Sequence, residues 1–151
     1  MPEPVIFVEN LVKRYGATLA VDGISFAVER GVTTALLGGN GAGKTTTLSI
    51  LLGLLLPTSG SVRIFNEDVL HHRYRVLPRM NFSSPYVDLP HRLTVRQNLL
   101  FYGRLYGVRN LGRRIEEIAE HMQVAPFLDR QSGKLSAGQK TRVALAKALI
   151  N

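Results

Sequence analysis

A glycine-rich stretch that ends in a lysine and a threonine, GGNGAGKT over residues 38–45, is the segment best suited to chemistry. It follows the pattern G-x-x-x-x-G-K-[ST], in which the glycines let successive backbone amides turn inward around phosphate oxygens. Lys44 adds a positive charge for the β- and γ-phosphates of a nucleotide, and the hydroxyl of Thr45 suits Mg²⁺, which prefers oxygen ligands. The pattern therefore predicts a nucleotide phosphate site that includes magnesium.

Such a loop works only if a strand leads into it and a helix follows it. Residues 32–39, VTTALLGG, form a continuous β-branched and apolar run, which is typical of a strand buried on both faces. Residues 44–55, KTTTLSILLGLL, have their leucines at helical spacing. The positive end of this helix would then point at the same phosphates. A glycine-rich turn with a surface lysine is the alternative, and the strand–loop–helix order favours the phosphate site.

A second segment, LSAGQ over residues 135–139, has two interpretations. Ser136 and Gln139 form an S-x-x-Q capping box, which predicts a helix start stabilised by about 1 kcal/mol. A helix start also concentrates unpaired N–H groups, so the same residues could receive an anion. Taken alone, the segment is only a capped helix.

An aromatic residue, Tyr15, ends the first predicted strand in VKRYG. Its ring could stack on a nucleotide base. From the residue alone, an ordinary edge-strand tyrosine is the favoured interpretation.

The rest of the chain changes character near its middle. Strands are predicted in VIFVENLVKRYG, LAVDGISFAVERG and SGSVRIF, and the segment RMNFSSPYVDLP is predicted to be a strand that runs into a proline-rich loop. Thr94 and Gln97 form a capping box for a helix that ends at Gly107, and LGRRIEEIAEHM predicts another helix. We therefore expect an α/β chain with a β-rich core over residues 1–80, a linker over 81–93 and a helical part over 94–151.

Composition excludes several other classes. The chain has 151 residues and a net charge of +8. It has no cysteine, which rules out disulfides and cysteine metal sites. Its basic residues are scattered, which favours a solvated basic surface with a phosphate site over nucleic-acid binding. The longest apolar stretch, residues 48–57, is shorter than the roughly 20 residues that span a bilayer. With no basic residue before the first apolar stretch, no signal peptide is expected, and the chain is predicted to be cytoplasmic.

Taken together, these motifs resemble the ATP-binding subunit of ABC transporters. GGNGAGKTT is similar to the Walker A loop of that family, LTVRQNL to the start of its helical subdomain, and LSAGQ to its LSGGQ signature. The resemblance covers essentially the whole chain. It implies a P-loop NTPase core with an antiparallel β subdomain and a helical signature subdomain. The segment TTTLSILLGLLLPTSGSVRIF resembles exporter-type subunits.

The resemblance also assigns roles. It implies ATP and Mg²⁺ as cofactors, with Thr45 on the metal and Tyr15 stacked on adenine. Ser136, Gly138 and Gln139 would face the γ-phosphate of ATP held by a second ATP-binding subunit in a head-to-tail dimer. The residues expected to bind ATP are Tyr15, Gly38, Asn40, Gly41, Ala42, Gly43, Lys44, Thr45 and Thr46, with Ser136, Gly138 and Gln139 acting in trans.

The chain departs from the family pattern in two ways. The position where the family usually carries a glutamine falls on Ser84 or Pro85, so the linker is either a rigid surface loop or a docking site for a transmembrane partner. The Walker B Asp-Glu pair and the later histidine of the family have no counterpart here, so no catalytic residue is assigned.

Three expectations follow from the resemblance. The chain alone binds ATP without hydrolysing it, and it is marginally stable because its P-loop strand lacks a neighbour. The protein lies at the inner face of the membrane, bound to a transmembrane permease. A soluble ABC ATPase of translation or repair and a non-catalytic nucleotide-binding fragment are the alternatives.

Overall fold

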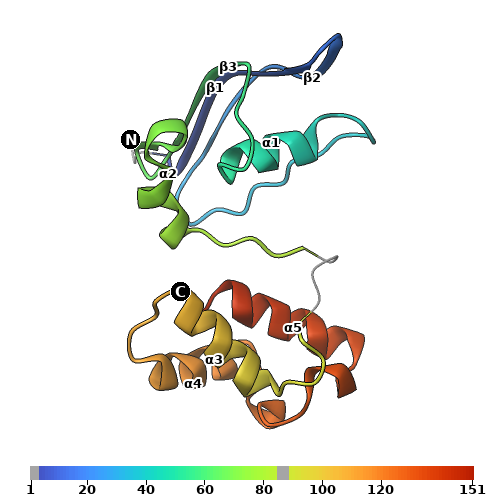
Figure 1. Ribbon diagram of the computed structural model, residues 1–151, viewed down its shortest axis with the longest axis vertical. Coiled ribbons are helices and arrows are strands. Elements are labelled where there is room, and N and C mark those ends of the chain that lie inside the picture. Colours follow the sequence, from blue (N-terminus) through green and yellow to red (C-terminus); the bar gives the residue numbers. More distant parts are fainter. Residues whose placement is uncertain (1–3, 85–88) are drawn as a thin grey trace. The chain divides into compact units, whose positions relative to one another are not determined.

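The computed structural model describes residues 4–84 and 89–151, in two compact units (Figure 1). The first unit is Met1–Leu77 and the second is Pro78–Asn151. Each unit is described by itself below.

An antiparallel sheet of four strands, in the order β2-β1-β3-β4, forms the first unit. The strands are β1 (Ile6–Tyr15), β2 (Thr18–Val28), β3 (Ser59–Ile64) and β4 (Glu67–Asp68). Ile6 lies opposite Val28 on one side and Ile64 on the other, which sets the register. The predicted antiparallel β part of an α/β fold is thereby confirmed.

One helix, α1 (Lys44–Leu51), packs against this sheet (Figure 1). The core that they share consists of alternate strand residues and the buried side of the helix: Val8, Leu11, Val21, Val62, Ile64, Ile50 and Leu51. The helix is shorter than the predicted range of 44–55. It ends at Leu51 because Gly53 adopts a positive φ of 64°, the left-handed conformation that commonly terminates helices.

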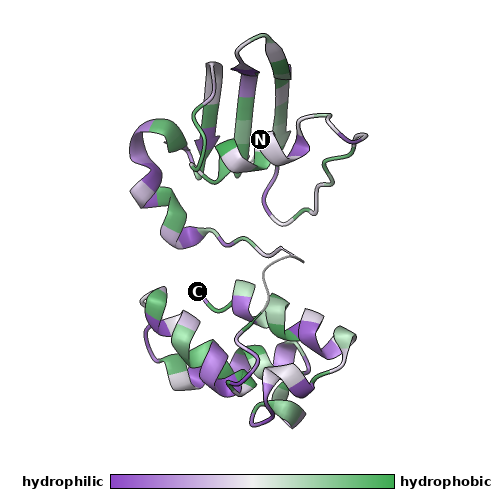
Figure 2. Ribbon diagram, turned by 45° about the vertical axis from the view of Figure 1, so that its right-hand side comes forward, coloured by the Kyte–Doolittle hydropathy of each residue, from purple (hydrophilic) through white to green (hydrophobic). Residues whose placement is uncertain are grey.

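The predicted buried strand over residues 32–39 is wrong. The segment has no regular secondary structure, and Leu37 is 86% exposed. Figure 2 shows hydrophobic colour on part of the extended segment before α1. A strand forms only where a neighbour supplies N–H and C=O partners, and none of the described strands pairs with this segment. The apolar run marks a segment suited to burial, but the described part of the chain does not bury it.

A short helix, α2 (Val69–Val76), follows β4 and was not predicted. Asp68 caps it by accepting a hydrogen bond from the Leu70 amide at 2.8 Å, and it also bonds Nδ1 of His71 at 2.9 Å. Burial alone would raise the pKa of Asp68, but its hydrogen bonds to His71 and Leu70, together with the electrostatic attraction of His71, hold that pKa below its ordinary value.

The chain continues through a 3₁₀ turn, η1 (Leu77–Arg79). The strand predicted in RMNFSSPYVDLP is wrong for the described residues Met80–Ser84, which have no regular secondary structure. Their apolar residues lack a strand partner, as residues 32–39 do.

Helices α3 (Val95–Leu105), α4 (Leu111–His121) and α5 (Ala137–Ala148) make up the second unit, with two 3₁₀ turns, η2 (Ala125–Phe127) and η3 (Ser132–Lys134). The predicted capping box of α3 is confirmed, since the Gln97 amide donates to Thr94 Oγ1 at 3.1 Å and the Thr94 amide to Gln97 Oε1 at 2.9 Å. The apolar faces meet in one core (Figure 2), which includes Val95, Leu99, Ile115, Ile118, Ala119, Val124, Leu135, Val143, Ala146 and Ile150.

Candidate functional site

The phosphate loop, residues 38–45, is positioned by close contact with β2. Gly43 has a φ of 79°, and a Cβ added to it would overlap the carbonyl oxygen of Ala20. Gly41 also has a positive φ, of 84°. Only glycine adopts such angles at little cost, so these two residues give the loop its path.

The side chain of Lys44 folds back across this loop. Its Nζ atom donates hydrogen bonds to the carbonyl oxygens of Gly38 and Gly39, each at 2.7 Å. An ammonium group has three donors, so one remains for a phosphate oxygen. The positive charge is therefore held inside the loop.

The first turn of α1 presents donors toward the same loop. Gly43 supplies no side-chain cap, and the first turn contains no acidic residue. The leading amides, including those of Thr45 and Thr46, thus have no partner within the helix. Thr47 is buried and donates through Oγ1 to the Gly43 carbonyl at 3.0 Å, which anchors the turn. An anion is the natural occupant of this arrangement.

Magnesium would depend on the nucleotide at this site. Thr45 is exposed at the first turn, so its hydroxyl can be a metal ligand. Across residues 4–84 and 89–151 there is no group of three or more His, Asp or Glu side chains that could hold a metal ion. The residues present fit a cation whose other ligands are phosphate oxygens and water.

Tyr15 lies at the end of β1 and is 50% exposed. Lys13 Nζ lies 5.0 Å from the centre of its ring and also donates to the Leu56 carbonyl at 2.8 Å. The ring is accessible to a base, and it is also an ordinary edge-strand tyrosine. Its role in adenine binding stays a prediction.

In the second unit, the signature segment LSAGQ begins α5. The Gln139 amide donates to Ser136 Oγ at 3.3 Å and the Ser136 amide to Gln139 Oε1 at 3.0 Å, which confirms the capping box. A Cβ added to Gly138 would meet nothing within 4 Å. Among residues 4–84 and 89–151, no contact therefore requires a glycine at this position.

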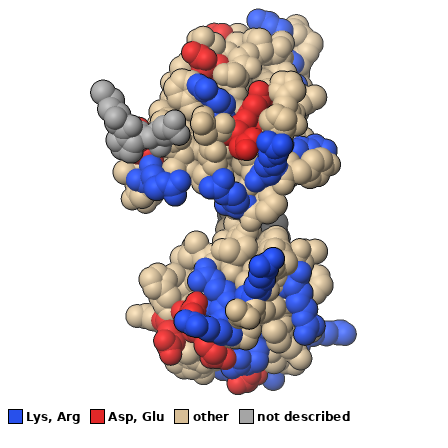
Figure 3. All heavy atoms as spheres, turned by 90° about the vertical axis from the view of Figure 1, so that its left-hand side faces the viewer, with Lys and Arg blue, Asp and Glu red and all other residues tan. Residues whose placement is uncertain are grey.

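The predicted site residues divide between the two units. The first contains Tyr15 and the loop residues Gly38 to Thr46, and the second contains Ser136, Gly138 and Gln139. Ser84 lies in a segment without helix or strand, and Pro85 falls outside the described residues. Basic side chains are spread over both units with acidic side chains among them (Figure 3).

One buried polar residue close to the signature segment was not predicted from the sequence. Asn98 on α3 is fully buried, and its Nδ2 atom donates to Ser132 Oγ at 2.9 Å. Its burial could have been predicted from its position. Asn98 follows the helix cap Thr94 by four residues and lies on the side of the helix that carries the apolar residues Val95 and Leu99.

The loop geometry and the helix behind it define the chain as a P-loop nucleotide-binding protein. A family model described as ABC transporter matches residues 21–151. The chain belongs to the ABC transporter family.

Curated relatives agree with this family. The chain is 37% identical over 150 residues to a Nod factor export ATP-binding protein I of Ralstonia nicotianae, covering 98% of this chain and 47% of that protein. It is 35% identical over 147 residues to the bacitracin transport ATP-binding protein BcrA of Bacillus licheniformis, covering 97% of this chain and 48% of that protein. The chain thus spans about half the length of these relatives.

Solved structures show the same fold. The ADP conformation of MJ1267, an ATP-binding cassette of an ABC transporter, aligns with a TM-score of 0.82 at 28% identity, over 98% of this chain and 65% of that one. A nucleotide-free cassette aligns with a TM-score of 0.78 at 27% identity. In the part of the chain that the structure describes, no helix is both long and apolar enough to cross a membrane.

Proposed function

We propose that this chain is the nucleotide-binding part of an ABC transporter ATPase of the exporter type, and that it binds ATP with Mg²⁺ through residues 38–46. The observation that carries the proposal is Lys44, whose ammonium group is held in the loop with one donor to spare. The unpaired amides of α1 supply the remaining contacts to phosphate. Export and transport are named in the relatives from Ralstonia and Bacillus, which supports the exporter assignment.

The signature segment supplies the second half of the proposed site. Gly138 lies in the first turn of α5 with open space beside it, so a phosphate of ATP bound to another subunit could approach the helix start closely. Ser136 has its amide and hydroxyl in the capping box, which keeps the helix start rigid. ATP would then lie between Lys44 of one subunit and Ser136 and Gly138 of the other, in a head-to-tail dimer.

Hydrolysis is proposed for the whole transporter ATPase and not for the 151-residue chain alone. Phosphoryl transfer relies on positioned charge around the γ-phosphate and on a group that orients the attacking water. Lys44 supplies part of that charge and Thr45 a ligand for the metal, whereas the residues assigned to the site include no Asp or Glu that could act as a base toward water. The chain is therefore expected to bind ATP without turning it over.

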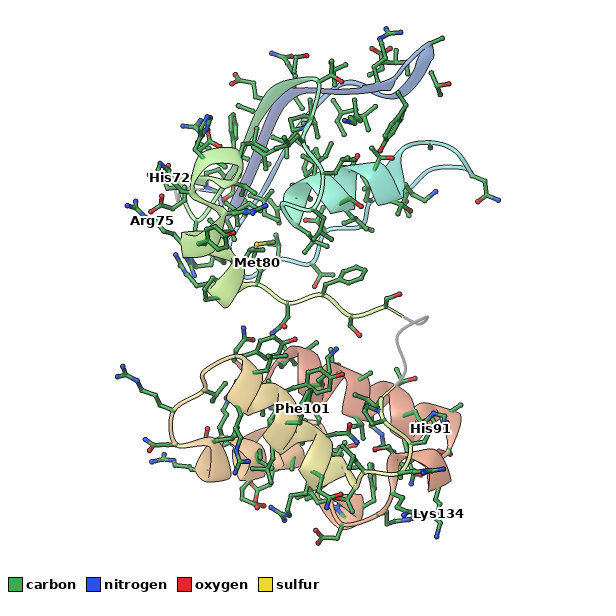
Figure 4. All side chains as sticks on the ribbon, in the orientation of Figure 1. His72, Arg75, Met80, His91, Phe101 and Lys134 are labelled. Carbon is green, nitrogen blue, oxygen red and sulfur yellow. The ribbon has the colours of Figure 1, made fainter. Side chains whose placement is uncertain are left out.

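A membrane permease is the proposed partner, and the surface of α3 is the proposed contact. A hollow of about 570 Å³ is lined by Leu93, Gln97, Leu100, Phe101, Arg104 and Leu105. Phe101, labelled in Figure 4, is 54% exposed and Leu105 is 66% exposed, and their spacing of four residues places them on the same face of α3. A cytoplasmic helix of the permease would cover them, and the pair of ATPase and permease would lie at the inner membrane face.

Nucleotide titration tests the ATP site directly. Wild-type chain should bind a fluorescent ATP analogue in the presence of Mg²⁺, and Lys44→Ala should weaken binding by about 10- to 100-fold, since it removes a charged hydrogen bond to phosphate. Lys134→Ala is the matched control, because it removes an equal charge from an exposed position in the other unit. Equal binding by wild type and Lys44→Ala would overturn the proposal, and Lys44-dependent phosphate release by the chain would overturn the expected lack of turnover.

A further inference from the structure

A backbone clamp joins the start of α3 to the loop that leads into the signature segment. We define the clamp as residues 91–96 and 128–133. Four backbone hydrogen bonds cross it: Ser132 to Leu93 at 2.9 Å, Gly133 to His91 at 3.0 Å, Val95 to Arg130 at 3.0 Å and Arg96 to Leu128 at 2.8 Å. Thr94 and Gln131 form an antiparallel bridge between the same segments.

The two segments lie unusually close together at one point. A Cβ added to Gly133 would come within 3.1 Å of the Cβ of His91, tighter than most Cβ contacts, so a larger residue there would require a small shift of His91. Figure 4 shows His91 and Lys134 on the same side of the second unit, where these segments meet. Any shift of residues 91–94 therefore displaces the loop at 130–134.

Asn98 is the side chain that locks this clamp. Its Nδ2 atom lies 2.9 Å from Ser132 Oγ, 3.0 Å from the Thr94 carbonyl and 3.3 Å from the Pro90 carbonyl, so its two N–H groups are shared among three acceptors. Two of these acceptors are carbonyls, which cannot donate, so the amide must present its NH₂ group to them. Asn98 thus contacts both sides of the clamp at once.

The oxygen atom of the Asn98 side chain shows that burying this residue does not simply stabilise the fold. Asn98 Oδ1 is buried without a hydrogen-bond partner among the described residues. An unpaired buried acceptor is costly. The two carbonyls also accept hydrogen bonds from backbone N–H groups. The Thr94 carbonyl accepts from the backbone N–H of Asn98 at 3.0 Å, and the Pro90 carbonyl from the backbone N–H of Leu93 at 3.3 Å. Ser132 Oγ thus accepts its hydrogen bond from Asn98, whereas the two carbonyls also have backbone donors.

Ser132 lies one short turn before the signature segment. It begins η3 (Ser132–Lys134), its carbonyl accepts from the Leu135 amide at 3.4 Å, and Ser136 follows as the cap of α5. We propose that Asn98 is a positioning residue, which sets the start of α5 through Ser132 so that Ser136 and Gly138 meet the ATP of a second subunit. This inference rests on the proposed function.

The test compares Asn98→Leu with wild type. Leucine has the same number and branching of side-chain heavy atoms as asparagine and keeps the site filled, while it removes the bond to Ser132. Dimerisation driven by a non-hydrolysable ATP analogue should weaken by about tenfold, the effect expected for one lost buried hydrogen bond. Binding of the nucleotide to the protein's own phosphate loop, measured at monomer concentrations, should stay within about twofold. Ser132→Ala should reproduce this split.

Ile118→Ala is the control for loss of stability alone. Ile118 packs in the core of the second unit and lies outside the clamp. If Ile118→Ala lowers the melting temperature more than Asn98→Leu yet dimerises better, a positioning role is supported. Normal dimerisation by Asn98→Leu, or a loss that only follows the melting temperature of each variant, would overturn the inference. Failure of wild type to dimerise with the analogue would instead overturn the proposed function, and the inference with it.

Discussion

Gly43 packs against the carbonyl oxygen of Ala20, with no room for a Cβ between them. This contact joins the last residue before α1 to the start of β2, where Ala20 is the third residue of the strand. The phosphate loop is therefore anchored to the antiparallel sheet at a point where only glycine fits.

Gly43→Ala is expected to disrupt the nucleotide site. The new methyl group overlaps the Ala20 carbonyl, and the φ of 79° is strained for alanine, so the first turn of α1 must move. We expect destabilisation of about 1–3 kcal/mol in urea unfolding, together with loss of ATP-analogue binding. Gly39→Ala is the matched control, because nothing lies within 4 Å of a Cβ there and its φ is not positive. Equal effects of the two changes would contradict the structure.

Gly138→Ala should separate stability from function. The position lies in the first turn of α5 with open space around it, so alanine should stabilise the helix by about 0.5–1 kcal/mol. If Gly138 faces a phosphate of another subunit, the same methyl group should reduce ATP-driven dimerisation. Thermal unfolding measures the first effect and light scattering with an ATP analogue the second. A variant that is more stable and dimerises as well as wild type would argue against the proposed contact.

Acid should release the cap of α2. The pKa of Asp68 is below its ordinary value of 3.8 in the folded protein, so its carboxylate favours the fold above that pH. This contribution disappears as the pH falls through the lowered pKa. NMR shifts of the Leu70 and His71 amides should therefore titrate with a midpoint below 3.8. Asp68→Asn keeps a capping oxygen but cannot titrate, so its amide shifts should not show this transition.

The apolar segment before the phosphate loop should contribute little to the stability of the 151-residue chain. Leu37 is 86% exposed, whereas Ile50 on α1 is fully buried. Leu37→Ala is expected to change the free energy of unfolding by less than about 0.5 kcal/mol. Ile50→Ala should lower it by about 2–5 kcal/mol. A large loss for Leu37→Ala in urea unfolding would show that this segment is packed in solution.

Local chemistry explains which features could be predicted from sequence. The capping boxes at Thr94 and Ser136 involve residues three positions apart, so their types alone predict both bonds. The phosphate loop is similar, because its glycines and Lys44 act within one turn of chain. The two predicted strands that proved wrong, residues 32–39 and 80–84, depend instead on partners elsewhere. An apolar run reports suitability for burial, and pairing is a property of two segments.

The sequence by itself determined the phosphate loop, the helix starts and the family, because each depends on neighbouring residues or on motifs read in order. Only the tertiary structure decided what lies against them. Gly43 contacts Ala20, which lies 23 residues earlier in the chain, and Asn98 contacts Ser132, which lies 34 residues later. The physical reason is that hydrogen bonding and steric exclusion act between atoms brought together by the folded chain, and no local pattern specifies such pairs.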